Sequence, residues 1–365
     1  MQARKSKLEK DRAKIARYRA LTKKVLESKN QKLYTTEALE DTATILNVNP
    51  EFNAVWNYRR NILAHLFSTG SISKPEALGG DLHMSMEMMK RYPKCYWIWN
   101  HRRWCLEKSD EFGIADWGRE LAIASKVLSM DSRNFHGWQY RRYVVSNMER
   151  HAAAKTGPEG YKEQLDINLR EFQYTTAVIN KSTSNFSAWH NRTTLITKIL
   201  VLLRKCEEIK DPLELSTDAV HTEKTVQIFQ SPLDLLSHEL DLVKTGMFMD
   251  ADDTSVWLYM QWLLTDDIFV RGLSPEKYTA VIHQQLSDVN ELNQLEKEDS
   301  LAGSENVWCL KTIIFLRALL SSNNGLDQDV KDDSEIQRAL GLLVDLDPLR
   351  KGHYLDQLSG KAAIC

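Results

Sequence analysis

The sequence predicts an all-α fold built from stacked helical hairpins, and three observations support this prediction. A short motif centred on Trp recurs along the chain at intervals of about 40 to 70 residues, which is typical of stacked supersecondary units. No stretch alternates apolar and polar residues as a half-buried strand does. Gly and Pro are few, at 15 and 8 residues, which favours long helices over turn-rich structure.

The repeated motif places an Arg three residues after the Trp, so that both side chains lie on one face of a helix. Its copies are Trp56 with Arg59, Trp99 with Arg102, Trp138 with Arg141, Trp189 with Arg192, Trp257 without the Arg, and Trp308 with Lys311. We expect the Trp side chains to pack between the layers of the stack. Two roles stay open for the Arg side chains. They can pack over a ring or beside a carboxylate of the next helix, or they can form a cationic rib that faces a partner or a ligand.

Each Trp helix is expected to be the second helix of a hairpin. The first helices are predicted at residues 36–48, 81–90, 116–130, 161–179, 232–247 and 287–295. A seventh segment, 335–346, leads into Asp347-Pro348-Leu349-Arg350 and a closing turn at Tyr354-Leu355. Insertions at 151–160, 205–231 and 321–334 are expected to be loops or short extra helices. Residues 33–365 are therefore interpreted as one helical-repeat domain of about six to seven hairpins.

Residues 1–32 form a separate basic segment, with twelve Lys or Arg against three acidic residues and no Pro or Gly. A weak apolar stripe through Leu8, Ile15 and Val25 predicts a helix. This segment is either a solvated leading helix or a basic arm that docks on an acidic partner surface.

Composition excludes several classes of function. The net charge of −2 argues against nucleic acid as the main partner, and no apolar run is long enough to span a membrane. The charged amino terminus lacks the apolar core of a signal peptide. Five scattered Cys without a CxxC pair favour a reducing, cytoplasmic location and argue against a zinc site built from Cys. Cys365 is expected to be an ordinary tail thiol and not part of a CaaX box.

Two cations stand where the other copies of the motif have mostly small or acidic residues. Lys94 lies five residues before Trp99, and His136 lies two residues before Trp138. Both precede the second helix of a hairpin, where free backbone N–H groups collect. Equivalent points of neighbouring hairpins lie side by side, so we expect both side chains to meet one anion. The alternative is an ordinary surface Lys and a loop His whose hydrogen bonds are satisfied.

The copies at residues 50–60, 93–103, 134–142 and 185–192 resemble the repeats of protein prenyltransferase α subunits. The resemblance extends from about residue 35 to about residue 355. Within the family, the chain most resembles the type II branch, the α subunits of Rab geranylgeranyltransferases. Three stretches support that choice: Asn49-Pro50-Glu51-Phe52 in the first copy, residues 305–314, and residues 346–350 followed by Tyr354-Leu355.

This resemblance implies a right-handed superhelical crescent wrapped around a β subunit that holds the catalytic zinc. The chain itself would bind no cofactor, contribute no metal ligand and be inactive alone. The heterodimer would transfer geranylgeranyl from geranylgeranyl diphosphate to C-terminal cysteines of Rab GTPases, which an escort protein presents. The escort protein is expected to dock on outer helices within residues 161–260.

The resemblance also assigns residues to the reaction. Lys94, Tyr96 and His136 correspond to family residues near the isoprenoid diphosphate, and Lys94 and His136 are expected to act on the leaving group. Phe135 replaces a Tyr of many relatives, and Gln2 replaces a His that can reach the β-subunit zinc.

Two other functions remain open at this stage. The chain could be the shared α subunit of farnesyltransferase and geranylgeranyltransferase type I. It could also be a non-catalytic helical-repeat scaffold of the tetratricopeptide type, although its irregular spacing and the absence of that repeat's small-residue signature argue against this.

Overall fold

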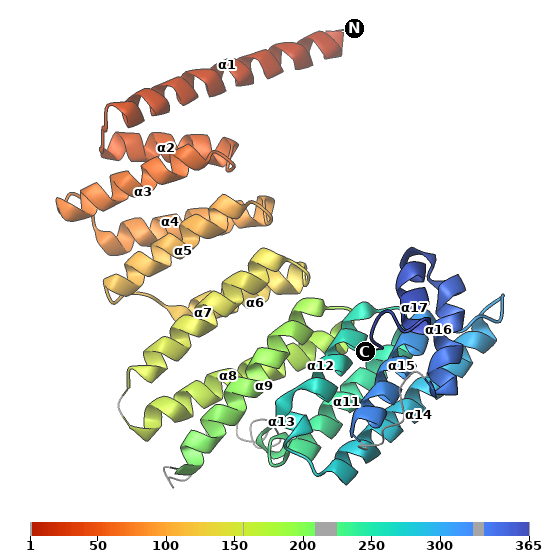
Figure 1. The fold of residues 1–365 in the computed structure, drawn as a ribbon. Coiled ribbons are helices and arrows are strands. Elements are labelled where there is room, and N and C mark those ends of the chain that lie inside the picture. The colour runs from red at the N-terminus through yellow and green to blue at the C-terminus, as the bar shows by residue number, and fades with distance from the viewer. Residues whose placement is uncertain (1, 156, 209–224, 324–331, 365) are drawn as a thin grey trace. The chain divides into compact units, whose positions relative to one another are not determined.

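The structure is a computed structural model that describes residues 2–155, 157–208, 225–323 and 332–364. Figure 1 shows helices joined by short connections, and the described residues contain no strand. The all-α prediction is thus confirmed. Much of the predicted insertions 205–231 and 321–334 lies outside the described residues, as do Cys365 and the side chain of Gln2.

Most helices pair as antiparallel hairpins, and we call the first helix of each hairpin the A helix and the second the B helix. The A and B helices are α2 (Thr36–Val48) and α3 (Asn53–Ser68), α4 (Lys74–Arg91) and α5 (Tyr96–Glu111), α6 (Trp117–Met130) and α7 (Phe135–Ala153), α8 (Pro158–Lys181) and α9 (Phe186–Glu208), α11 (Pro232–Met249) and α12 (Thr254–Thr265), and α14 (Pro275–Asp299) and α15 (Val307–Asn323). The remaining elements are α1 (Gln2–Asn30), α13 (Asp267–Val270), α16 (Ser334–Leu346), η2 (Pro348–Arg350) and α17 (Lys351–Leu358).

Two A helices begin earlier than the sequence pattern predicted. Helix α4 begins at Lys74 and not near residue 81, because Ser73 accepts a hydrogen bond from the Glu76 N–H and Pro75 occupies the first turn. Helix α14 begins at Pro275 and not at residue 287, again behind a Ser cap. A Ser cap followed by Pro is a strong start signal for a helix. The apolar stripe alone marks only the part of each helix that packs.

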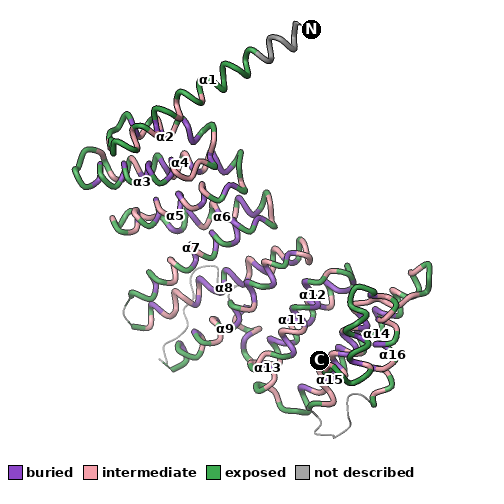
Figure 2. The backbone as a smooth tube through the Cα atoms, turned by 45° about the horizontal axis from the view of Figure 1, so that its top comes forward, coloured by how far each residue is buried: buried purple, intermediate pink, exposed green. Residues whose placement is uncertain are grey.

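The chain divides into two compact units, Met1–Asn147 and Met148–Cys365, so that the boundary falls within α7. In the first unit a core cluster of Leu63, Phe67, Leu78 and Cys105 joins the first two hairpins. In the second unit the cluster around Leu310, Ile314, Ile336, Leu340 and Tyr354 closes the last hairpin with α16 and α17. Figure 2 shows the buried residues following the packed faces of the helices.

The motif Trp residues fix each B helix to the loop before it. The indole N–H donates to the backbone carbonyl six residues earlier: Trp56 to Pro50 at 2.8 Å, Trp99 to Pro93 at 2.9 Å, Trp138 to Ser132 at 2.8 Å, Trp189 to Thr183 at 2.6 Å and Trp257 to Ala251 at 2.9 Å. All five Trp side chains are buried. Trp308 is only half-buried, and the Lys311 ammonium lies 5.0 Å from the centre of its ring.

Helix α1 packs on the first hairpin through its carboxyl-terminal half only. Val25 is buried, whereas residues 9–17 are exposed, as the outer end of α1 in Figure 2 shows. Asn49 donates to the Tyr18 hydroxyl at 2.8 Å, and Lys24 pairs with Asp41 at 2.8 Å. Among the described residues, no helix has both the length and the apolar composition needed to cross a bilayer.

Candidate functional site

The Arg residues of the motif link each hairpin to the next in the interior of the stack. Arg102 on α5 donates to the Ser85 hydroxyl of its own A helix α4 at 2.9 Å. The same guanidinium forms a bidentate pair with Glu120 on α6, the next A helix, at 2.7 and 3.0 Å. One buried cation therefore holds three helices together, and two parallel N–H···O bonds fix their positions.

Arg59 and Arg192 repeat both of these links, and Arg141 repeats the link to its own A helix. Arg59 donates to Thr42 at 2.9 Å and to Asp81 at 2.9 Å, Arg192 donates to Thr175 at 3.1 Å and to Glu239 at 2.8 Å, and Arg141 donates to Ser125 at 2.7 Å. All four motif Arg side chains are buried. The hypothesis that they form an exposed cationic rib is therefore wrong, because all four side chains are buried between helices.

Each of these carboxylates also accepts a hydrogen bond from its own B helix, at the position two residues after the Trp. Tyr140 donates to Glu120 at 2.5 Å, and Tyr259 donates to Glu239 at 2.5 Å. Burial alone would raise the pKa of Glu239, but the charge of Arg192 and the hydrogen bonds lower this pKa to about 2. The carboxylate thus stays charged throughout the neutral range.

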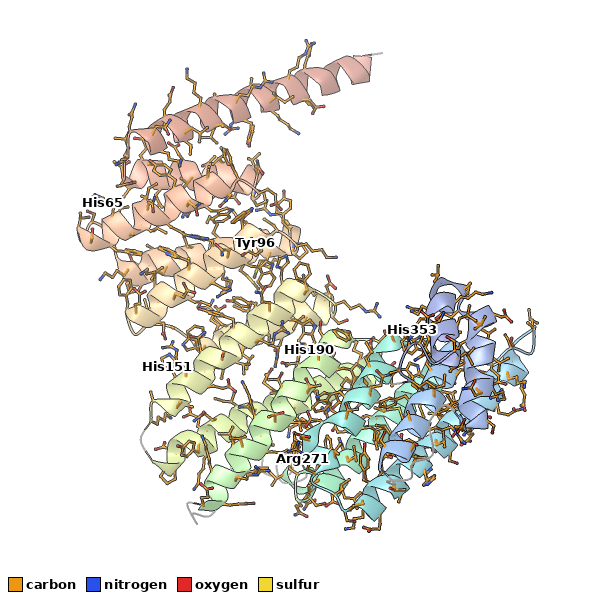
Figure 3. The ribbon with its side chains drawn as sticks, in the orientation of Figure 1. His65, Tyr96, His151, His190, Arg271 and His353 are labelled. Carbon is orange, nitrogen blue, oxygen red and sulfur yellow. The ribbon has the colours of Figure 1, made fainter. Side chains whose placement is uncertain are left out.

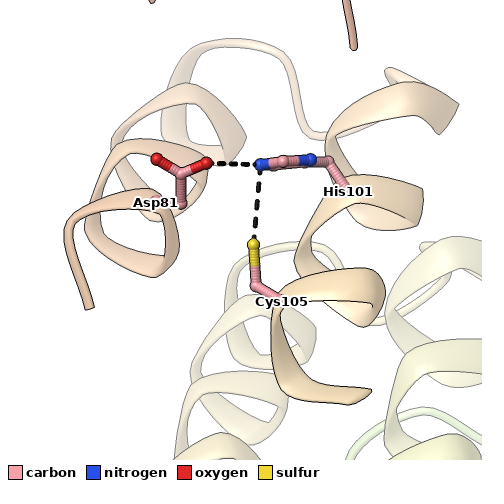
Figure 4. Close-up of side chains that lie close together, drawn as sticks. All are labelled: Asp81, His101 and Cys105. Atoms are coloured by element: carbon pink, nitrogen blue, oxygen red, sulfur yellow. Dashed lines mark hydrogen bonds and ion pairs between the residues drawn. The ribbon is translucent and has the colours of Figure 1, made fainter. Parts of the chain in front are cut away.

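In the second hairpin His101 takes the place of this Tyr and brings a potential metal-ligand set together. Asp81, His101 and Cys105 are all buried, and their ligand atoms lie within 4.8 Å of one another (Figure 4). The scattered positions of the Cys residues in the sequence did not predict this cluster. His101 Nε2 lies 2.8 Å from Asp81 and 3.5 Å from the Cys105 sulfur.

Hydrogen bonds already occupy the donor and acceptor atoms of this cluster. Arg60 Nε–H can only donate, and it lies 3.4 Å from His101 Nδ1, so the proton of the neutral ring is on Nε2 and faces Asp81. Burial raises the pKa of Cys105 well above its usual value. Burial alone would also raise the pKa of Asp81, but the bonds from His101 and Arg59 lower it to about 2. A metal ion would have to displace these bonds, so the arrangement fits a hydrogen-bonded link between hairpins.

The second feature is the group Lys94, Tyr96 and His136 at the loops that join A to B helices in the first unit. Figure 3 shows Tyr96 at this edge, whereas His65 marks the opposite edge, where α3 ends. The His136 ring lies 6.0 Å from the Tyr96 ring and stacks on Trp99 at 6.3 Å. His136 also faces the backbone of Lys94 through a hydrogen bond. The structure therefore brings together the two positions that the sequence singled out.

His136 and Lys94 differ in their surroundings. Burial lowers the pKa of His136, and the hydrogen bond to the Lys94 backbone opposes this shift only in part. The ring is therefore neutral at pH 7, and its one N–H is directed at Lys94. The Lys94 side chain is 74% exposed, and its ammonium lies 3.8 Å from the Asp131 carboxylate. This loose contact leaves the ammonium accessible to an anion from solvent.

Below this edge, a small cavity of about 20 Å³ separates helices α5 and α7. Its lining residues are Tyr96, Trp99, Asn100, Arg103, His136, Gln139 and Tyr140. Arg103 adds a second cation to the Lys94 ammonium, and the sequence pattern did not predict it. The signal was present, since a second Arg follows the motif Arg in the first three copies, but the pattern alone did not show which of the two faces inward.

Exposed apolar side chains also gather at these A-to-B loops. In the first unit they are Val48, Tyr96, Met130 and Phe135, and in the second unit they are Phe186, Met249 and Leu301. Large apolar residues that recur at one point of each repeat are typical of a surface that another molecule covers.

Comparison with known proteins identifies the family of this chain. The pattern described as "Protein prenyltransferase alpha subunit repeat" matches residues 35–66, 80–109, 117–148, 169–199 and 236–266. The chain belongs to the protein prenyltransferase α-subunit family. The matched segments coincide with the first five hairpins, in which the buried Trp is retained.

Relatives from fungi align with nearly the whole chain. The chain is 43% identical to "Geranylgeranyl transferase type-2 subunit alpha" of Candida albicans, over 100% of this chain and 96% of that protein. It is 36% identical to the Saccharomyces cerevisiae protein of the same name, over 95% of this chain and 93% of that protein. The solved structure titled "Candida albicans protein geranylgeranyltransferase-I complexed with GGPP" matches with a TM-score of 0.61, at 22% identity, over 94% of this chain and 90% of that one. This last match shows a shared fold.

Proposed function

We propose that this chain is the α subunit of a type II, Rab-directed geranylgeranyltransferase. With a zinc-containing β subunit it transfers geranylgeranyl from geranylgeranyl diphosphate to C-terminal cysteines of Rab GTPases presented by an escort protein. The observation that carries the proposal is the 43% identity to a type-2 α subunit over the full chain. The shared α subunit of farnesyltransferase and type I enzymes is the second candidate, but the type I match, at 22% identity, supports the fold alone.

The chemistry explains what Lys94 and His136 contribute. A thiolate attacks C1 of the allylic diphosphate, the C1–O bond breaks, and the diphosphate departs with both bonding electrons. The zinc held by the β subunit would lower the pKa of the acceptor thiol. Negative charge grows on the bridging oxygen as the bond breaks, so a cation beside it stabilises the transition state more than the ground state. We assign this role to the Lys94 ammonium, and its 74% exposure supports the assignment.

His136 has a different part in this proposal. In the free subunit the neutral ring uses its N–H on the Lys94 backbone and so holds the loop that carries Lys94. A bound diphosphate would favour protonation, which gives the ring a second N–H donor. The contribution of His136 to transfer should therefore be present at low pH and decline as pH rises through the raised pKa of the complex.

A single-turnover assay on purified heterodimers tests the proposal. Lys94→Ala should lower the rate of the chemical step by about 10-fold or more while the heterodimer still forms. His136→Ala should have a smaller effect, largest at acidic pH. Lys126→Ala, which removes an exposed Lys from α6, is the matched control and should transfer at the wild-type rate. Wild-type chemistry in the Lys94→Ala, His136→Ala double variant would reduce both residues to structural roles.

Choice of partner separates the candidate functions. The chain should co-purify with a type II β subunit, and recovery with a farnesyltransferase β subunit would favour the shared-subunit alternative. The chain alone should transfer no lipid and hold no stoichiometric zinc. We place the enzyme in the cytoplasm, since the four described Cys residues are free and buried. We place escort docking on the outer helices of residues 161–260, which charge removal there would test.

A further inference from the structure

A second and larger cavity, of about 330 Å³, lies between the second and third hairpins of the first unit. Its walls come from the A helices α4 and α6, from the carboxyl-terminal half of α5 and from the loop between α5 and α6. Neither Lys94 nor His136 belongs to its lining. An apolar cavity of about 150 Å³ holds a benzene ring, so this cavity has room for roughly twice that bulk. Its volume falls in the range of small-molecule sites.

A Gly in the middle of α4 keeps this cavity open. Gly in a helix interior lowers the stability of the helix relative to Ala, so Gly79 needs a reason. Packing within the chain is not the reason, because a Cβ added at Gly79 would meet no packing neighbour within 4 Å. Gly79 lines the cavity, and any larger side chain there would occupy its space. The adjacent Gly80 lies outside the lining, and nothing in the structure explains it.

The buried floor of the cavity has polar groups without partners. Ser109 is 3% exposed and lines the cavity, and its hydroxyl forms no hydrogen bond with the residues that the structure describes. Arg102 is 2% exposed and also lines the cavity. One Nη2 hydrogen of Arg102 donates to Glu120 at 2.7 Å, whereas the other has no acceptor in the described part of the chain. Buried donors left unpaired cost free energy, which an oxygen atom of a ligand would recover.

The open side of the cavity is basic. Arg119 on α6 and His83 on α4 are both exposed and line it. Its two acidic lining residues are already used within the chain, since Glu120 pairs with Arg102 and Asp116 accepts from the Arg119 backbone N–H at 2.9 Å. Across the described ranges, no carboxylate forms an ion pair with the Arg119 guanidinium. This guanidinium, in the first turn of α6, is therefore available to an anion.

We propose that this cavity binds a small amphiphilic organic anion. Its carboxylate would meet Arg119 at the mouth, and a hydroxyl or carbonyl oxygen at its other end would bond to Ser109 and Arg102 on the floor. Between these ends the walls are apolar, with Met86 and Ile123 among the lining residues, and they suit a body the size of a ring. The inference goes beyond the proposed function, because the site shares no residue with the Lys94 and His136 group.

Methyl NMR of the full chain, with its Met methyl groups labelled with carbon-13, tests the site because Met86 lines the cavity. The probe is 3-(4-hydroxyphenyl)propionate, which combines a carboxylate, a ring and a hydroxyl. Its addition should shift the methyl signal of Met86, which Met86→Leu identifies by removing it. The signal of Met247, fully buried in the second unit, should not move.

Two matched probes separate the contributions of the ends of the ligand. 3-Phenylpropionate lacks the hydroxyl and should bind about 5-fold more weakly, because the floor donors stay unpaired. 4-(3-Hydroxypropyl)phenol lacks the charge and should bind about 10-fold more weakly. Arg119→Gln should remove this preference for the charged probe.

A pair of Gly variants tests the location. Gly79→Leu should weaken binding at least about 10-fold, because the new side chain fills the cavity, and it should not lower the melting temperature, since Leu favours a helix. Gly80→Leu is the matched control. A Cβ at Gly80 also meets open space, but Gly80 does not line the cavity, so this variant should bind as the wild type does.

Three results would overturn the inference. Unchanged binding in Gly79→Leu would place the probe elsewhere, and Ser109→Ala, which should lose the preference for the hydroxyl, checks the same point without filling the cavity. Equal affinity of the wild type for the charged and uncharged probes would show that the site does not select anions. A Met86 signal that stays fixed at millimolar probe would show that the cavity holds no such ligand. None of these measurements involves lipid transfer, so their failure would leave the proposed function intact.

Discussion

The two units share the type of residue that stands three places after the motif Trp and differ in the residue that stands four places after it. Three residues after the Trp, both units have an inward-facing Arg, as Arg102 and Arg192 illustrate. Four residues after the Trp, the first unit has Arg60, Arg103 and Arg142, whereas the second unit has Thr193, Gln261 and Thr312. The interior position is therefore kept by the need to join hairpins, which both units share. The position four residues after the Trp is basic in the first unit and uncharged in the second.

Within the second unit, the last hairpins show what the interior position requires. Met260 replaces the Arg after Trp257, yet Asp288 on the next A helix still has a cation, because Lys244 reaches it at 2.8 Å. After Trp308, Lys311 pairs with Asp347 at 2.8 Å. The identity of the cation changes while the buried carboxylate keeps a partner. This is expected, since an unpaired charge in the interior costs several kcal/mol.

The largest predicted effect comes from removing the cation of a buried carboxylate in the second unit. Arg192→Met would leave Glu239, which is fully buried, without its cation, and should cost about 3–5 kcal/mol of unfolding free energy. Urea denaturation followed by circular dichroism would measure the loss. Adding Glu239→Leu should recover most of it, because both charges are then absent. A single variant that unfolds like the wild type would show that the pair does not hold the hairpins together.

A second prediction compares the buried Trp257 with Trp308 of the last hairpin, which is only half-buried. Trp257→Ala should cost about 3–5 kcal/mol, because the ring is buried and leaves a cavity. Trp308→Ala should cost clearly less, since Trp308 is already half-buried. Thermal melting of the two variants side by side would test the difference. Equal losses would mean that the exposed part of Trp308 is as well packed as the buried ring of Trp257.

The hairpins could be predicted from the sequence because each buried motif Trp bonds to a residue only six places earlier in the chain. The sequence could not predict the buried ion pairs between hairpins. Arg192 and Glu239, for example, are 47 residues apart in the chain, and only the packed fold brings them together. The sequence located Lys94 and His136 correctly as neighbours, but both were interpreted as cations. Burial of His136 against Trp99 lowers its pKa, and no sequence pattern shows how deeply a loop side chain is covered. The different burial of Arg102 and Arg103 could not be predicted, because two adjacent Arg residues give no sign of which one faces inward.

A third prediction concerns the second hairpin, where His101 takes the place of the Tyr that bonds the buried carboxylate. Burial keeps the pKa of His101 below its usual value. In the unfolded chain His101 therefore binds a proton near pH 6.5, whereas in the folded chain it binds this proton only at lower pH. The stability that neutral His101 gives to the first unit is fully present above pH 6.5 and is lost as pH falls toward the folded pKa. Hydrogen exchange of α4 and α5 between pH 7 and pH 5 should show this loss. His101→Gln should abolish that pH dependence, and a dependence unchanged in the variant would assign it to other groups.

The smallest predicted effect comes from Lys244, the substitute cation of the second unit. The Lys244 side chain is 43% exposed, and Asp288 keeps a second donor in Gln284 at 3.0 Å. Water and Gln284 can therefore compensate when the ammonium is removed, so Lys244→Met should cost only about 1 kcal/mol. The loss should shrink further in 1 M salt, which screens a partly exposed pair, whereas the larger cost of Arg192→Met should persist. Urea titrations of both variants at low and high salt would make this comparison. If Lys244→Met were as costly as Arg192→Met, burial of the carboxylate alone, and not the exposure of its cation, would set the strength of the link.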